Sequence, residues 1–231
     1  MSRFFGVLSA ACAVLLSACT SMGEHVQTAR EQVQFGPPET VNVCLYVDQG
    51  ISEEEGRKLV REAWQDEGSM YGIDINVVQV KQWSRPAFQM EGILHALRQQ
   101  RLEPPCDRIL ALVGRHIGDF LWSFVGPEVL GAVNDETLTH GYAAARVATF
   151  NQLMTPPVAV TRHEIYHLLG CGEHYAMSHC YERIARLKQW KHAHGGDFFP
   201  AWDLVNKQLL ASREAVNDRL EPMRAAAVAA R

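Results

Sequence analysis

The stretch of sequence that decides the fold is HEIYHLLGCGEH, residues 163–174. Its first five residues have the pattern His-Glu-x-x-His, and residues four apart on a helix lie on the same face. His163 and His167 can therefore direct ring nitrogens at one zinc ion (Zn²⁺), at Zn–N distances of ~2.0–2.1 Å. Glu164 flanks that face and is placed to take a proton from a water activated by the metal rather than to bind the metal.

A glycine follows this motif at the position where the helix must end. Gly170 can adopt a positive φ, so the chain can turn sharply and return a third ligand to the metal. The whole segment HEIYHLLGCGEHYAM, residues 163–177, resembles the metzincin signature HExxHxxGxxH followed by a Met-turn. The order of strands and helices before it is similar to the N-terminal half of a metzincin catalytic domain, so the resemblance covers roughly residues 41–180.

This resemblance implies a fold and an activity. The fold is a zincin-like α/β (α+β) domain with a mixed, twisted sheet, an active-site helix and a helical C-terminal part from about residue 181. The activity is that of a zinc endopeptidase with a peptide or protein substrate. In the family, an extended substrate pairs with an edge strand above the active-site helix, and residues 129–146 are the candidate for that edge.

The sequence departs from the family pattern at the third ligand and at the Met-turn. Glu173 occupies the family's ligand position, and His174 follows it by one residue. We expect His174 to be the ligand, because the turn is glycine-rich and imidazole is the commoner third ligand of this arrangement. Glu173 is the alternative, and Glu182 would be the ligand in a gluzincin-like arrangement. Met177 is the Met-turn candidate, although it follows His174 by only three residues.

The pattern along the chain predicts an α/β order of elements. Strands are expected at 41–47, 73–80, 109–113, 129–133 and 142–150, with a bulge at Val77-Val78 because the alternation slips there. Helices are expected from Ser52, around 90–97, over the His-Glu-x-x-His motif, near 181–192 and near 204–220. Ser52 and Glu55 have the spacing of a capping box.

The N-terminus has the layout of a secretory signal. Residues 1–18 read MSRFFGVLSAACAVLLSA, with one charge before a short apolar run. The run ends in LSAC, which resembles the bacterial lipobox, so we expect cleavage before Cys19 and lipidation of its thiol. Residues 19–38 are then a tether, 39–222 the catalytic domain and 223–231 a tail. Thr20 in place of an Asp favours the outer membrane, facing the periplasm or the cell surface.

Four cysteines remain in the exported domain, and an even number suggests two disulfides. We expect Cys44 to pair with Cys106 and Cys171 with Cys180. The second pair would bracket the loop that carries the third ligand.

The composition excludes several classes of protein. The chain has 231 residues, 47% hydrophobic and 21% charged, which rules out a disordered or fibrous chain. Its formal net charge of -4 argues against a nucleic-acid partner, because no basic surplus exists to neutralise phosphates. The expected partners are a substrate and the membrane, the latter through the lipid, and the domain is expected to be a monomer.

Two other functions compete with the lipid-anchored zinc endopeptidase. One is a catalytically inactive zincin-fold scaffold, which would have no need of Glu164. The other is a chance motif on a helix that packs through apolar residues such as Ile165 and Leu168. The intact Glu164 argues against the first, and the continuation from Gly170 to His174 argues against the second.

Overall fold

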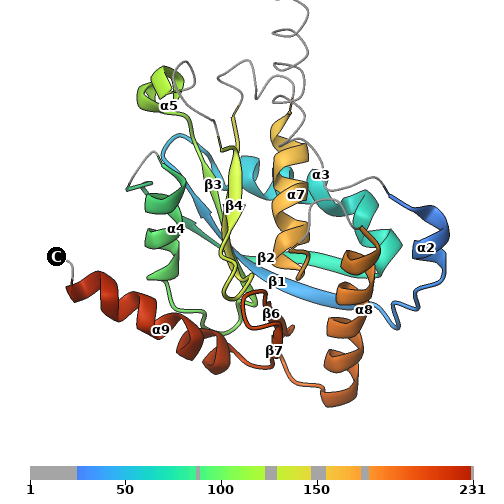
Figure 1. The fold of residues 1–231 in the computed structure, drawn as a ribbon. Helices are drawn as coiled ribbons and strands as arrows, with labels where there is room; N and C mark the ends of the chain where they lie inside the picture. The colour runs from blue at the N-terminus through green and yellow to red at the C-terminus, as the bar shows by residue number, and fades with distance from the viewer. Residues whose placement is uncertain (1–24, 87–88, 123–128, 147–154, 173–176, 230–231) are drawn as a thin grey trace, which may run out of the picture.

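The computed structural model describes residues 25–86, 89–122, 129–146, 155–172 and 177–229 (Figure 1). Within them lies an α/β fold built on a mixed, mostly parallel sheet of five strands in the order β2-β1-β3-β5-β4. The strands are β1 (Glu39–Val47), β2 (Ile73–Gln82), β3 (Arg108–Val113), β4 (Gly131–Val133) and β5 (His140–Ala144). Only β4, at the edge, runs antiparallel to its neighbour. The α/β class expected from the sequence is therefore confirmed.

Helices cover both faces of the sheet. The described helices are α2 (Gln27–Glu31), α3 (Glu53–Tyr71), α4 (Met90–Arg98), α5 (Ile117–Trp122), α7 (Pro157–Leu168), α8 (Met177–His194) and α9 (Arg213–Ala229). Figure 1 shows α4 on one side of β3 and β5, and α7 with α3 on the other. The crossovers through α3 and α4 allow β2, β1 and β3 to be parallel.

Local sequence signals explain why these elements begin and end where they do. The side chain of Ser52 accepts from the backbone N–H of Glu55, and the Glu55 carboxylate accepts from the N–H of Ser52, so the predicted capping box is confirmed. Gly72, with φ of 58°, ends the same helix. The predicted bulge in β2 is also present, because Val43 pairs with Val77 whereas Cys44 pairs with Gln79.

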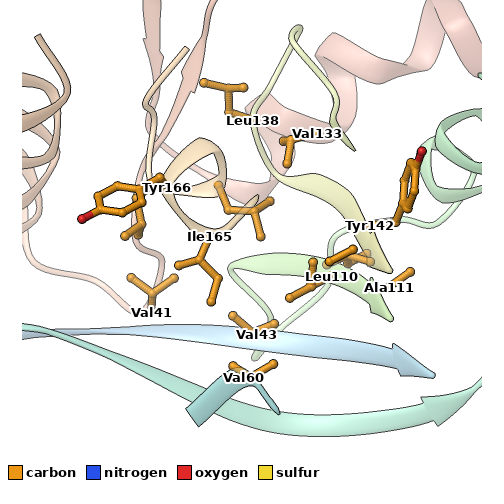
Figure 2. Close-up of a cluster of buried hydrophobic side chains, with 14 of the residues drawn as sticks. Val41, Val43, Val60, Leu110, Ala111, Val133, Leu138, Tyr142, Ile165 and Tyr166 are labelled. Atoms are coloured by element: carbon orange, nitrogen blue, oxygen red, sulfur yellow. The ribbon is translucent and has the colours of Figure 1, made fainter. Parts of the chain in front are cut away.

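The core lies between α7 and the sheet. Ile165 on α7 is 1% exposed and points toward Val41 and Val43 of β1 (Figure 2). All six residues of β3 are buried, as expected for a central strand. Burial of this inner face fixes the rotation of α7 about its own axis, and therefore the direction in which His163 and His167 point.

The C-terminal part differs from the expected pair of helices. A hairpin of β6 (Ala201–Asp203) and β7 (Gln208–Leu210) separates α8 from α9, so the helix predicted from residue 204 was wrong there. Asp203 organises the hairpin turn by accepting from the backbone N–H of Asn206 at 2.8 Å and from Arg219 at 2.6 Å. Strands of three residues are too short to show a periodicity in the sequence. The last helix, α9, runs past residue 222, where the tail was expected to begin.

Part of the expected tether is in contact with the domain. Residues 25–38 include α2, and the ring of Phe35 meets Tyr71 of α3 edge-on at 5.1 Å. The Nδ1 atom of His25 lies 2.9 Å from the hydroxyl of Tyr181 on α8. These contacts hold the segment against α3 and α8. The signal segment and Cys19 lie outside the described residues.

Both expected disulfides are present. Cys44 pairs with Cys106, and Cys171 pairs with Cys180. Disulfides are typical of proteins outside the cytoplasm. In the part of the chain that the structure describes, no helix is both long enough and apolar enough to span a bilayer.

Candidate metal centre

The helix that carries the motif, α7, ends in a Schellman motif. Gly170 has φ of 100°, its N–H donates to the carbonyl oxygen of His167, and the N–H of Cys171 donates to that of Tyr166. The positive φ predicted for Gly170 is therefore confirmed. The turn sends the chain back toward the cleft side of the helix immediately after His167.

The two histidines converge on one point. The Nε2 atoms of His163 and His167 lie 3.1 Å apart, close to the ~3.3 Å expected for two nitrogens bound tetrahedrally to one zinc ion. Nδ1 of His167 lies 2.5 Å from the carbonyl oxygen of Cys171, which can only accept, so Nδ1 carries the proton. The lone pair of His167 Nε2 is then directed at the shared point, as a metal ligand requires. The histidine pair therefore fits a zinc ion.

Glu164 is buried beside the pair. Its side chain is 3% exposed, and Oε2 has no hydrogen-bond partner among the described residues. Burial raises the pKa of this carboxyl well above its usual value. A buried carboxyl oxygen without a partner costs free energy unless a ligand satisfies it.

Gly131 of the edge strand makes room for Glu164. A Cβ at Gly131 would lie 2.4 Å from Oε1 and 2.7 Å from Cδ of Glu164, so any side chain at this position would force Glu164 to move. The edge strand therefore approaches the carboxyl with its bare backbone. This residue was not identified from the sequence, because its contact with α7 is not local; a glycine inside a predicted edge strand was the available signal.

The motif opens into a cleft of about 490 Å³ that passes the free edge of β4. His163, Glu164 and His167 line it from α7, and Gly131 lines it from β4. Apolar side chains line much of the rest: Met90, Leu94, Val129, Leu130, Ala132, Val133, Ala159, Val160 and Leu204. The cleft thus joins the candidate metal ligands to the edge strand β4.

The remaining predicted site residues fall in different places. Glu173 and His174 lie outside the described residues. Glu182 is exposed on α8 and lines a separate depression with His179, so it is not part of the cleft. Met177 begins α8, is 1% exposed and does not line the cleft. Over the described ranges, no group of three or more His, Cys, Asp or Glu side chains is placed to hold a metal ion.

The side of α7 that packs against α3 carries a buried polar cluster. The hydroxyl of Tyr166 donates to Oε2 of Glu67 at 2.5 Å and lies 3.1 Å from the hydroxyl of Tyr71. The rings of Trp64 and Tyr166 meet edge-on at 5.1 Å. Burial raises the pKa of Tyr166, so its hydroxyl stays a donor. Tyr166 thus fills the space between α7 and α3.

Comparisons with known proteins add no family. No protein-family model and no curated protein matches the sequence. Among solved structures, one titled "Structure of a chaperone-substrate complex" matches with a TM-score of 0.41 and 15% sequence identity. The match covers 58% of this chain and 23% of that one, so this chain spans under a quarter of its length. A likeness this distant gives no information about function.

Proposed function

We propose that the chain is a zinc-dependent endopeptidase, anchored by a lipid on Cys19 in the bacterial envelope. The observation that carries this proposal is the pairing of His163 and His167, whose Nε2 atoms lie 3.1 Å apart in a cleft. Beside them lies Oε2 of Glu164, which has no hydrogen-bond partner in the part of the chain that the structure describes. The metzincin-like segment that follows supports it, with Gly170 forming the sharp turn. His174 is the proposed third ligand, and Glu173 is the alternative.

The side chains around the cleft have separable roles in this mechanism. His163 and His167 would hold a zinc ion, which when bound supplies a Lewis acid for water and the peptide carbonyl. Glu164 accepts a proton from the attacking water and then delivers it to the amine of the leaving group. The carbonyl of Cys171 keeps the proton of His167 on Nδ1, so Nε2 remains available as a ligand.

The edge strand provides the proposed substrate track. Among the described strands β4 pairs with β5 alone, and its residues line the cleft. An extended peptide can add to such an edge through backbone hydrogen bonds. Gly131 places this edge directly against Glu164, so a peptide bound there passes the carboxyl. Strand addition explains why the substrate would be an unfolded segment rather than a folded surface.

The test uses the full chain and separates zinc binding from turnover. We expect about one zinc ion per chain and chelator-sensitive cleavage of an unstructured peptide library. Glu164→Gln should keep the zinc but reduce cleavage by at least ~100-fold, since general-base catalysis contributes 10²–10⁴. Glu182→Gln, an exposed change on α8, is the matched control and should cleave normally. Zinc binding without cleavage in the wild type would instead support the inactive scaffold, and absence of zinc would refute the peptidase.

The envelope location is supported by the lipobox-like LSAC sequence and by the two disulfides. A lipid on Cys19 would hold the domain at a membrane without a spanning helix. The outer membrane is proposed because Thr20, not Asp, follows the cysteine.

A further inference from the structure

We propose that the cleft selects peptides that carry a Lys or Arg side chain two to four positions from the scissile bond, recognised by the acidic turn 134–136. This inference deepens the proposed function and rests on it. The turn follows β4 directly, and Asn134, Asp135 and Glu136 all line the cleft.

The turn is held in a fixed shape. The backbone N–H of Glu136 donates to Oδ1 of Asn134 at 2.9 Å, and the N–H of Leu138 donates to the carbonyl oxygen of Asn134 at 2.8 Å. From outside, the N–H of Leu204 donates to the carbonyl oxygen of Asp135 at 3.0 Å. A rigid turn presents the Asp135 and Glu136 carboxylates with little loss of conformational entropy on binding.

An unpartnered polar atom lies at the same turn. The side chain of Asn134 is 2% exposed, and its Nδ2 atom has no hydrogen-bond partner among the described residues. Together with Oε2 of Glu164, it gives the cleft two buried polar atoms without partners among the described residues, one at each end of β4. Nδ2 of Asn134 can only donate, so the group that would satisfy it is an acceptor, such as a backbone carbonyl of a bound peptide or a water, while the basic side chain binds the carboxylates.

Away from the histidines, most of the charged side chains that line the cleft are acidic. Glu91, Asp135 and Glu136 line it there, against Arg98 as the single basic side chain in the described lining. Arg98 lies 3.6 Å from Glu91 on the same helix, so these two charges offset each other and the acidic character of the cleft comes from the turn 134–136. A cleft of one sign of charge favours ligands of the opposite sign.

The length of β4 sets the distance between the acidic turn 134–136 and Glu164, where the peptide bond would be cleaved. Gly131 contacts Glu164, and Asn134 is three residues further along. At ~3.3 Å per residue the turn begins about 10 Å from Gly131. An extended substrate peptide has a similar rise per residue. A substrate residue about three positions from the scissile bond therefore reaches the turn. The four-carbon stem of a lysine can lie on apolar neighbours such as Val133 and Leu204 while its ammonium reaches Glu136.

The experiment compares peptide sets that differ by Lys, Gln or Glu at each of four positions on either side of the scissile bond. We expect Lys to raise kcat/KM over Gln by roughly three- to tenfold at one position two to four residues away, and Glu to lower it. Glu136→Gln should remove the preference, and Glu136→Lys should invert it toward Glu. Glu103→Gln and Glu103→Lys, made at an exposed loop position, are the matched controls and should leave the preference unchanged.

A binding measurement separates this inference from the proposed function. Glu164→Gln should bind the Lys peptide more tightly than the Gln peptide, with a difference that shrinks at high salt. Cleavage by the wild type without any effect of Glu136 changes would overturn the inference and leave the peptidase intact. Absence of cleavage together with equal binding of the Lys, Gln and Glu peptides would overturn both.

Discussion

His167 and Cys171 are joined across the turn that ends α7, with Nδ1 of the histidine 2.5 Å from the carbonyl oxygen of the cysteine. Cys171 is in turn bonded to Cys180 near the start of α8. The position of the carbonyl that orients His167 therefore depends on a covalent link from the turn after α7 to α8. The same link closes the segment that contains Glu173 and His174 in the sequence.

Removal of this disulfide should weaken metal binding. In Cys171→Ser/Cys180→Ser, the carbonyl of residue 171 is less fixed, and zinc affinity should fall by about tenfold, the lower end of the effects of removing partners that orient metal ligands. Competition with a chelating dye measures this. Cys44→Ser/Cys106→Ser is the control: it removes the other disulfide, so it should lower stability without changing zinc affinity. Equal zinc affinities in both double variants would contradict the orienting role.

Gly131→Ala should impair turnover more than metal binding. The added Cβ would overlap the Glu164 side chain, which must move away from the histidine pair. We expect kcat to fall by about tenfold or more, because small displacements of a catalytic group are costly, while zinc content stays near that of the wild type. Gly114→Ala adds the same methyl group where the nearest atom is 3.5 Å away, so it should be close to normal. A fully active Gly131→Ala would show that Glu164 does not require a residue without a side chain at position 131.

His140 should make the domain sensitive to acid. Its Nε2 lies 3.0 Å from the carbonyl oxygen of Gln100, and burial lowers the pKa of this fully buried ring to about 3. Between about pH 6.5 and this pKa, the unfolded chain binds a proton that the folded chain does not. The free energy of unfolding should thus fall as the pH drops below about 6.5, by up to ~1.4 kcal/mol per pH unit from His140 alone.

Urea unfolding between pH 7 and pH 4.5 tests this expectation. His140→Gln should be less stable at pH 7 but lose less stability per pH unit than the wild type, because the residue no longer titrates. His192→Gln, at an exposed position on α8, should keep the wild-type slope. If all three slopes agree, His140 does not control the acid response.

Arg108 should be among the most sensitive positions of the fold. Its buried guanidinium donates to four backbone carbonyl oxygens, those of Asp107, Leu168, Phe199 and Pro200. Arg108→Met should destabilise the protein by about 3–5 kcal/mol, since it leaves buried acceptors unpaired. Arg108→Lys should retain only part of this stability, because a lysine ammonium lacks the planar set of donors by which the guanidinium reaches several carbonyls. Denaturant unfolding gives the values, with the exposed Arg61→Met as control; a change under 1 kcal/mol in Arg108→Met would contradict this role.

Cys19→Ser should release the protein from the membrane. Without the thiol no acyl chain can be attached, and the described domain contains no helix able to span a bilayer. Fractionation of cells should move the protein from the membrane pellet to the soluble fraction, and incorporation of a labelled fatty acid should be lost. Cys12→Ser, within the same signal segment, should change neither result. Membrane retention of Cys19→Ser would point to another anchor.

Local patterns allowed much of the fold to be predicted. The capping box of Ser52 and Glu55, the bulge at Val77-Val78 and the positive φ of Gly170 each depend on a few neighbouring residues, so the sequence alone indicates them. Both cysteine pairings were also predicted. The histidine pair followed from helical periodicity, which places positions four apart on one face.

Features that depend on distant contacts were not predicted. The β6–β7 hairpin is organised by Asp203 with Arg219, sixteen residues away, and its strands are too short to show a pattern. The closeness of Gly131 to Glu164 depends on how β4 is placed against α7. The acidic turn after β4 lines the cleft together with Leu204 of the C-terminal segment, whose N–H donates to the carbonyl oxygen of Asp135.

Tyr166 has a practical consequence for mutational scanning of the motif. It lies one residue before His167 in the chain, yet its side chain packs against α3 and donates to Glu67. A substitution there would abolish function by loosening the packing of two helices, and a screen that reads only activity would count the tyrosine as catalytic. Phenotypes at 163, 164 and 167 can be assigned to chemistry only when soluble yield and melting temperature are recorded beside them.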